Sequence, residues 1–243
     1  MNLKHKVVGA FTLSIMLLLT SCSGIFNSGT KGNGNLIVDD RKVDVFSKID
    51  IDGVFNVILD QGSKEAVRIE ADENLVELIE VKVSGNTLFV DLIDNASIGK
   101  STKLNVFITL VNINELSVNG VGDVSVKNPL VLDKLELDNS GVGDVNLVLD
   151  CNKLDVENSS VGDITLSGRA TNFNLINSGV GAVLALELDS KNTEIDISGV
   201  GDVKVNATHS IDIETSGVGD VEYSGNPKTQ NIEDNAVGDV EKL

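Results

Sequence analysis

An aspartate recurs along the second half of the chain, each time directly after a glycine. Six positions carry it: Asp123, Asp144, Asp163, Asp202, Asp220 and Asp239. Ala182 stands in its place in the fourth of seven copies. Because neighbouring β-strands lie about 4.8 Å apart, copies that stack in register would align these carboxylates along one edge. The row is therefore a candidate edge for binding a ligand or a cation.

Two kinds of chemistry suit a row of carboxylates. Each aspartate can accept hydrogen bonds from backbone N–H groups of its own turn, or the row can bind Ca²⁺, which prefers carboxylate and carbonyl oxygens. We favour the hydrogen-bonded turn, because the Ca²⁺-binding β-roll has a nonapeptide repeat and Ala182 interrupts this row. We therefore expect no metal site and no cofactor, with Ca²⁺ as the alternative.

The aspartates belong to a phrase, Ser/Asn-Gly-Val-Gly-Asp-Val, that returns seven times. Its second glycine never varies and occurs at Gly122, Gly143, Gly162, Gly181, Gly201, Gly219 and Gly238, separated by 21, 19, 19, 20, 18 and 19 residues. Glycine permits positive φ and close backbone approach, so we interpret these residues as structural corners. A phosphate-binding glycine loop would need a following helix and a basic or Mg²⁺-binding companion, and the sequence shows neither.

Between the corners, apolar and polar residues alternate with the period of a β-strand. In one copy the apolar residues are Ile211, Ile213, Val221 and Tyr223, and Val218 of the corner is counted with them. A unit of about 19 residues has room for two or three short strands and no helix. The sequence therefore predicts an all-β solenoid in which each unit forms one coil and buries its apolar side against the next.

The preceding part of the chain is strand-rich but lacks the full phrase. Residues 52–57 keep the Gly-Val-x-x-Val spacing, with Phe55 where the second glycine would stand, and residues 72–79 could form one short helix. Terminal units of solenoids are usually irregular because they cap the stack. We expect one domain over residues 36–243, with an irregular capping half at 36–115 and regular repeats at 116–243.

The first residues have the pattern of a bacterial lipoprotein signal. Lys4 and Lys6 precede an apolar run at residues 7–19, and Leu-Thr-Ser-Cys ends at Cys22. We expect cleavage after residue 21, acylation of Cys22 and a flexible tether over residues 22–35, which is rich in Gly, Ser and Asn. The alternatives are an ordinary cleaved signal, which needs no cysteine, and a membrane span, for which the apolar run is short. The expected location is the bacterial envelope, in the outer membrane.

Composition narrows the function further. The 243 residues carry a formal net charge of −18, with 41% hydrophobic and 3% aromatic residues. So acidic a chain would repel phosphates, which excludes nucleic acid as a partner, and its hydrophobic content argues against disorder. Once Cys22 is acylated, Cys151 is the only remaining thiol, so no intramolecular disulfide is expected.

Four segments of the front half resemble one known family in order and spacing. They are Arg-x-Val-x-x-Phe-Ser-Lys-Ile at 41–49, Gly-Val-Phe-Asn-Val at 53–57, Ile-Glu-Ala-Asp-Glu-Asn at 69–74 and Ser-Gly-Asn-Thr-Leu at 84–88. With the repeats behind a lipobox, the chain resembles the putative auto-transporter adhesin, head GIN domain family of Bacteroidetes-type bacteria. The resemblance implies a right-handed single-stranded β-helix in the cell envelope. It carries over no catalytic residues.

We therefore expect a non-enzymatic envelope lipoprotein whose acidic solenoid is an adhesion or scaffolding surface for a glycan or protein ligand. The alternative is a carbohydrate-active β-helix enzyme, which would need clustered acids with a nearby base. Few bases are available in the mature chain, and they are Arg41, Arg68, Arg169, His209 and the lysines. The last unit, ending at residues 240–243, shows no capping element, so we also expect homo-oligomers through that C-terminal coil.

Overall fold

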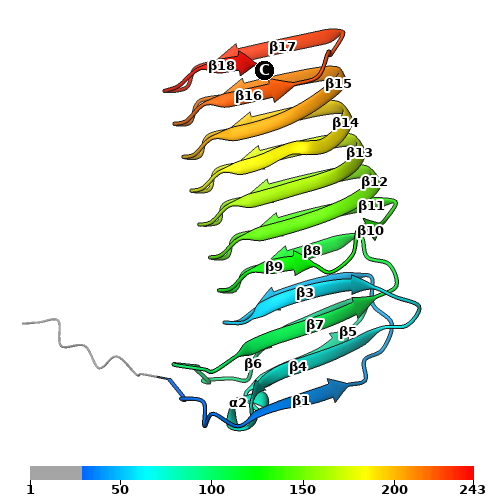
Figure 1. Ribbon diagram of the computed structural model, residues 1–243, viewed down its shortest axis with the longest axis vertical. Coiled ribbons are helices and arrows are strands. Elements are labelled where there is room, and N and C mark those ends of the chain that lie inside the picture. The colour runs from blue at the N-terminus through cyan, green and yellow to red at the C-terminus, as the bar shows by residue number, and fades with distance from the viewer. Residues whose placement is uncertain (1–28) are drawn as a thin grey trace, which may run out of the picture.

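The computed structural model describes residues 29–243, which form a tall stack of coils on a closed base (Figure 1). The signal predicted over residues 1–21, Cys22 and the first part of the tether lie outside the described residues. The strands are β1 (Leu36–Arg41), β2 (Lys48–Asp52), β3 (Asn56–Gln61), β4 (Ala66–Asp72), β5 (Ile79–Ser84), β6 (Thr87–Leu92), β7 (Leu104–Leu110), β8 (Glu115–Val118), β9 (Val124–Val126), β10 (Leu130–Val131), β11 (Lys134–Asn139), β12 (Val145–Asn158), β13 (Ile164–Asn177), β14 (Val183–Ile197), β15 (Val203–Thr215), β16 (Val221–Ser224), β17 (Thr229–Asp234) and β18 (Val240–Lys242). The helix is α2 (Glu73–Val76).

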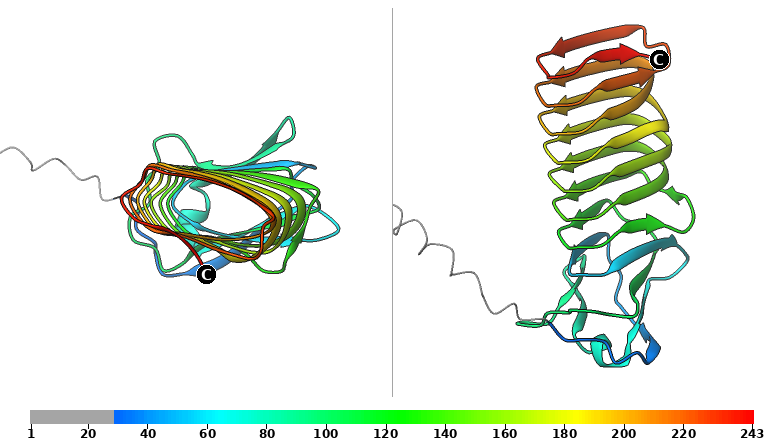
Figure 2. Two further views of the ribbon diagram at one scale, coloured as in Figure 1. Left: turned by 90° about the horizontal axis from the view of Figure 1, so that it is seen from above. Right: turned by 60° about the vertical axis from the view of Figure 1, so that its left-hand side comes forward.

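Each coil is a flattened loop with two strand-bearing faces (Figure 2). The return face consists of the strands that lead into a glycine corner, namely β8, β11, β17 and the second halves of β12–β15. The outbound face consists of the strands that leave the corner, namely β9, β16, β18 and the first halves of β12–β15. Neighbouring coils pair in parallel and in register, so that Leu154 lies between Leu135 and Phe173. The predicted all-β solenoid with coils of about 19 residues is confirmed.

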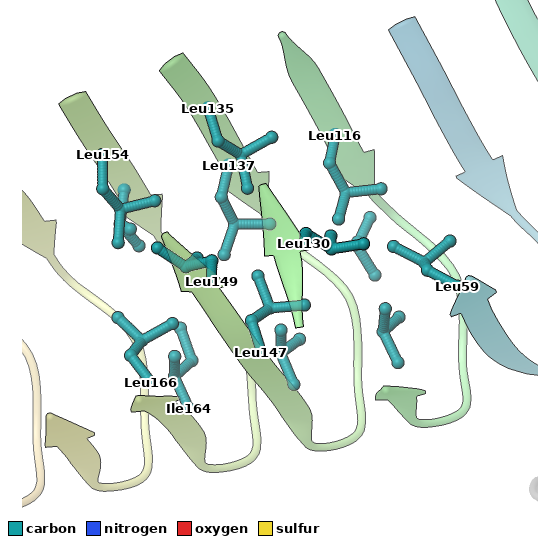
Figure 3. Close-up of a cluster of buried hydrophobic side chains, with 14 of the residues drawn as sticks. Leu59, Leu116, Leu130, Leu135, Leu137, Leu147, Leu149, Leu154, Ile164 and Leu166 are labelled. Carbon is teal, nitrogen blue, oxygen red and sulfur yellow. The ribbon is translucent and has the colours of Figure 1, made fainter. Parts of the chain in front are cut away.

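The core is a narrow space between the two faces, filled by aliphatic columns (Figure 3). Leu135, Leu137 and Leu154 point into it from the return face, and Leu147 and Leu166 point into it from the outbound face. All five are at most 1% exposed. Because only one side-chain layer from each face fits between the strands, branched aliphatic residues fill the space and few aromatic rings are needed.

The base closes the lower end of the stack with antiparallel strands. β1 pairs with β4, β4 with β7 and β5 with β6, all antiparallel. β2 and β3 lie between these antiparallel strands and the regular coils. β2 pairs with β8 and β3 with β9, although more than 60 residues separate the partners in the sequence. Residues 52–57, which keep the corner spacing with Phe55 in place of the second glycine, stack directly on the first full corner. A Cβ added to Gly122 would lie 2.5 Å from the carbonyl oxygen of Phe55. The helix expected over residues 72–79 is shorter, at Glu73–Val76.

The end of the predicted tether belongs to the base. The N–H of Thr30 donates to the carbonyl oxygen of Ser97 over 2.7 Å, and the N–H of Gly34 donates to Asp72 Oδ1 over 2.8 Å. The other carboxylate oxygen of Asp72 accepts from the N–H of Thr102 over 2.7 Å. These donors, that of Thr102 above all, hold the pKa of the buried Asp72 carboxyl below its usual range. The folded part therefore begins near residue 30, because hydrogen bonds to the base fix the segment that sequence composition marked as flexible.

Cys151 lies in the core of the outbound face and is 4% exposed. Burial raises the pKa of its thiol to about 11, so little thiolate forms near neutral pH. We assign it a packing role. Within residues 29–243, no helix has the length and apolar character needed to cross a membrane.

Candidate functional site

The seven glycine corners stack in one line along a narrow side of the solenoid, here called the corner edge (Figures 1 and 2). Their second glycines have φ between +136° and +152°. A Cβ added at Gly162 would lie 2.2 Å from the carbonyl oxygen of Gly143 in the coil below. Glycine is needed at this position both for its backbone angle and for the close approach of one coil to the next.

The aspartates of the corners form a ladder that links neighbouring coils. Oδ1 of Asp123 accepts a hydrogen bond from the N–H of Asp144 over 3.0 Å, and Oδ1 of Asp144 accepts from the N–H of Asp163 over 2.9 Å. Oδ1 of Asp163, Asp202 and Asp220 likewise accepts a hydrogen bond from the backbone N–H at the equivalent position of the next coil. The expectation that each aspartate binds its own turn was therefore wrong, because the in-register stack brings the next coil's N–H closer.

Among residues 29–243, no group of three or more His, Cys, Asp or Glu side chains could hold a metal ion.

The fourth coil provides a test of the ladder, because Ala182 offers no acceptor to the N–H of Asp202. Asn56 shows that an amide fits this position, since its Oδ1 accepts from the N–H of Asp123 over 3.0 Å. We expect Ala182→Asn to raise the free energy of unfolding by about 0.5–1 kcal/mol, the usual net value of one hydrogen bond. Ala182→Asp should gain less at low salt, because it places a carboxylate between two others, and should approach the Asn variant as salt rises. Urea unfolding of both variants at two salt concentrations measures this; equal stability of Ala182→Asn and the natural chain at both would contradict it.

Three outward columns run along the corner edge. The serine column contains Asn119, Ser140, Ser159, Ser178, Ser198, Ser216 and Asn235. The valine column contains Val121, Val142, Val161, Val180, Val200, Val218 and Val237, which are 49–73% exposed. The aspartate column is the ladder described above, and its members are also exposed. Sequence reasoning had counted the corner valine with the apolar side of the strand, whereas the structure turns it to solvent.

The return face carries a second set of acids in two outward columns. The first column contains Glu115, Glu136, Asp155, Asn174, Glu194, Asp212 and Asn231. The second contains Ser117, Asp138, Glu157, Ile176, Asp196, Glu214 and Glu233. Sequence composition indicated an acidic solenoid but not the concentration of its negative charge on one face.

These two columns border a shallow hollow of about 580 Å³. Ile176 lies among the acids and is 52% exposed. Two of the carboxylates have a local partner. Asp155 forms an ion pair with the Lys153 ammonium at 2.7 Å, and Asp212 accepts a hydrogen bond from the side-chain amide of Asn231 over 3.0 Å. The hollow is therefore a strongly negative surface with a small apolar centre.

The three arginines and the histidine considered for an enzymatic site do not line this hollow. Arg41 donates to the carbonyl oxygens of Val76 and Ile79 in the base, where it has a structural role. Arg68 pairs with Asp40 on the outside of the base, at 2.7 Å. Arg169 and His209 lie at the bend opposite the corners, where β13 and β15 pass from the outbound to the return face. Arg68 lines a second hollow, in which it and Lys127 lie with Asp40, Asp60 and Glu70.

Aromatic side chains are also missing from the outer surface of the regular coils. Residues 111–243 contain one Phe and one Tyr, at Phe173 and Tyr223, and these are 1% and 5% exposed. Sugar rings are commonly bound by stacking on exposed aromatic faces. The outer surface of these coils therefore favours a ligand held by charge over one held by stacking.

The architecture defines a β-solenoid protein with an acidic face, a repetitive corner edge and a closed base. The chain belongs to the family described as putative auto-transporter adhesin, head GIN domain, whose model matches residues 45–227. The resemblance found in the sequence is thereby confirmed.

Solved structures agree with this assignment. A putative adhesin from Bacteroides fragilis NCTC 9343 is 36% identical, with a TM-score of 0.86 over 88% of this chain and 100% of its own. A putative lipid binding protein and a putative adhesin from Parabacteroides distasonis ATCC 8503 are 20% and 22% identical, with TM-scores of 0.71 and 0.65. Each covers 88% of this chain and 99% of its own length, and they show the shared fold. No curated protein matches the chain.

Proposed function

We propose that the chain is a non-enzymatic, adhesin-like protein of the cell envelope that uses its acidic return face to hold a positively charged protein surface. The observation that carries this proposal is the pair of carboxylate columns around the hollow at Ile176. A flat, repetitive face of one charge sign suits a partner with a similarly extended basic surface, because complementary potentials steer and orient association. The family's description as adhesins supports an envelope or surface location.

Anchoring through Cys22 is part of this proposal. The lipobox at residues 19–22 supports it, and so does the place where the described chain begins, beside α2 in the base. A lipid anchor there would set the base toward the outer membrane and the regular coils away from it. Acyl chains of this kind bind membranes firmly because each buried CH₂ contributes about 0.8 kcal/mol. The coils would then be displayed to partners in the envelope as a scaffold.

Binding to a basic probe tests the role of the acidic face. We expect the triple variant Glu157→Gln, Glu194→Gln and Glu214→Gln to bind poly-L-lysine about tenfold more weakly, since each exposed ion pair contributes roughly 0.5 kcal/mol. The control, Glu187→Gln, Asp189→Asn and Glu241→Gln, removes the same charge outside the hollow and should keep most of the binding. Titration calorimetry or biolayer interferometry gives both affinities. Equal losses in the two variants would mean that net charge, and not the return face, governs binding.

A further inference from the structure

The corner edge has an apolar centre that no other part of residues 29–243 covers. Successive valines of the column are joined by parallel β-bridges from Val121 to Val237, so their side chains follow one another at the spacing of the coils. Seven coils about 4.8 Å apart make this strip about 30 Å long. Valine occupies the position in all seven copies although it is at least 49% exposed in each. An uninterrupted apolar line of this kind marks a surface suited to a partner.

The order of the three columns around the corner is fixed by the alternation of side chains. In one coil, Ser140, Val142 and Asp144 point outward, while Gly141 and Val145 are buried. Around the edge the columns therefore run serine, valine, aspartate. A partner that matches them must repeat at the same interval, and a second copy of this edge does so without any adjustment.

We propose that two copies of the chain pair side by side through their corner edges, parallel and in register. A two-fold axis parallel to the stack places valine column against valine column. It also places each aspartate column opposite the partner's serine column, whose hydroxyl and amide groups can donate to carboxylates. Ser140, Ser178 and Ser216 would exchange the hydrogen bonds that their hydroxyls donate within their own stack for these contacts. An antiparallel arrangement would instead bring aspartate against aspartate, and carboxylates at close range repel.

The aspartates have acceptor capacity to spare for such a contact. Only Oδ1 of Asp123, Asp144 and Asp163 is used by the ladder hydrogen bond to the next coil. The second carboxylate oxygen remains available for a serine of the partner. The acidic return faces lie outside the contact, so their like charges do not oppose each other across it.

The size of the strip predicts weak pairing in solution. A strip about 30 Å long and about 10 Å wide buries on the order of 600 Å² over both copies, below the roughly 1,200 Å² of stable interfaces. Confinement to a membrane raises the effective concentration and favours pairing. In this respect the inference rests on the proposed anchoring. Two copies held in one leaflet by their bases also share the parallel orientation that the columns require.

Disulfide trapping on vesicles tests the pairing. In a background with Cys22→Ser and Cys151→Ala, single cysteines replace Val121, Val161 or Val218, all of which are exposed. An N-terminal hexahistidine tag in place of residues 1–21 tethers the chain to phosphatidylcholine vesicles that carry a nickel-chelating lipid. With a copper–phenanthroline oxidant, each variant should form a disulfide with its own counterpart roughly tenfold faster on vesicles than the control Asn146→Cys on the outbound face.

The pattern of cross-links decides between arrangements. A parallel pair in register links Val121→Cys to itself and Val218→Cys to itself, whereas an antiparallel pair links positions at opposite ends and only the middle of the column to itself. The proposal is overturned if the two end positions fail to self-link on vesicles, or do so no faster than the control. Because the nickel lipid supplies the tether, this outcome does not depend on Cys22. Acylation is tested separately, by membrane fractionation of cells that express the natural chain or Cys22→Ser.

A variant with added negative charge tests whether the serine column faces the partner's aspartate column. Ser140→Asp, Ser159→Asp and Ser198→Asp together would place carboxylates opposite the partner's Asp144, Asp163 and Asp202 and should abolish self-linking of Val218→Cys. The matched control puts the same three charges on the outbound side, at Ser125, Ser167 and Ser224, and should leave linking unchanged. Circular dichroism verifies that both variants fold. Undiminished linking in the corner variant would overturn the proposal.

Discussion

Replacing Gly162 with alanine is expected to lower the free energy of unfolding by about 3 kcal/mol or more. The new Cβ would lie 2.2 Å from the carbonyl oxygen and 2.7 Å from the carbonyl carbon of Gly143. Both atoms are backbone in the coil below, so no side chain can move aside to relieve the contact. The φ of +143° adds strain for any residue with a Cβ. The corner must therefore open, and the coil-to-coil hydrogen bonds on either side of it weaken.

The control separates backbone strain from the clash. Gly85 also has a positive φ, +62°, but a Cβ added there meets nothing within 4 Å. Gly85→Ala should therefore cost only about 1 kcal/mol, the usual penalty for a left-handed conformation. Urea unfolding followed by circular dichroism compares the two variants. Equal losses would show that φ strain alone explains why glycine recurs at this corner position in all seven copies, and that the close approach of the coils contributes little.

The solenoid could be predicted from the sequence because its repeat, its corner glycines and its alternating strands all specify one structure. The corner was less well predicted, because its valine was classified by residue type. Counting alternation from buried Val145 back through Gly143 would have placed Val142 outward and Asn139 inward, as the structure has them. The alternation of side chains therefore predicts both the exposed valine column and the buried position of Asn139. It does not predict which N–H group each aspartate accepts from, because that depends on the register between coils.

The base shows what a repeat cannot predict. β2 and β3 lie beneath β8 and β9, and no periodic signal links residues so far apart in the chain. The buried Asp72 gathers the N–H groups of Gly34 and Thr102, neither of which stands out in sequence. The acidic return face was missed for a related reason. Its charges are spread evenly along the chain and become one surface only when the coils align.

The buried asparagines form a ladder inside the return face, on the core side of the corner. Asn139, Asn158 and Asn177 occupy the same position in three successive coils and are at most 4% exposed. Asn158 is the centre: its Nδ2 donates to Asn177 Oδ1 over 2.8 Å, and its Oδ1 accepts from Asn139 Nδ2 over 3.1 Å and from Ser160 Oγ over 2.7 Å. The ladder ends at Ile197, which leaves Asn177 Nδ2 buried without a partner.

We expect Asn158→Leu to lower the free energy of unfolding by about 3 kcal/mol, because it removes four buried hydrogen bonds, among them a long one from the N–H of Ser160, and leaves amide groups of both neighbours short of partners. Asn177→Leu is the matched control. It removes the two hydrogen bonds that Oδ1 accepts, from Asn158 Nδ2 and from the N–H of Gly179, together with an Nδ2 that is already unpaired, and it packs an apolar side chain against Ile197. Its cost should be smaller, about 2 kcal/mol. Urea unfolding of the two variants measures the difference. If they lose equal stability, the ladder acts as three separate buried residues; if Asn158→Leu loses more, the amides hold successive coils in register from the inside while the aspartates do so from the outside.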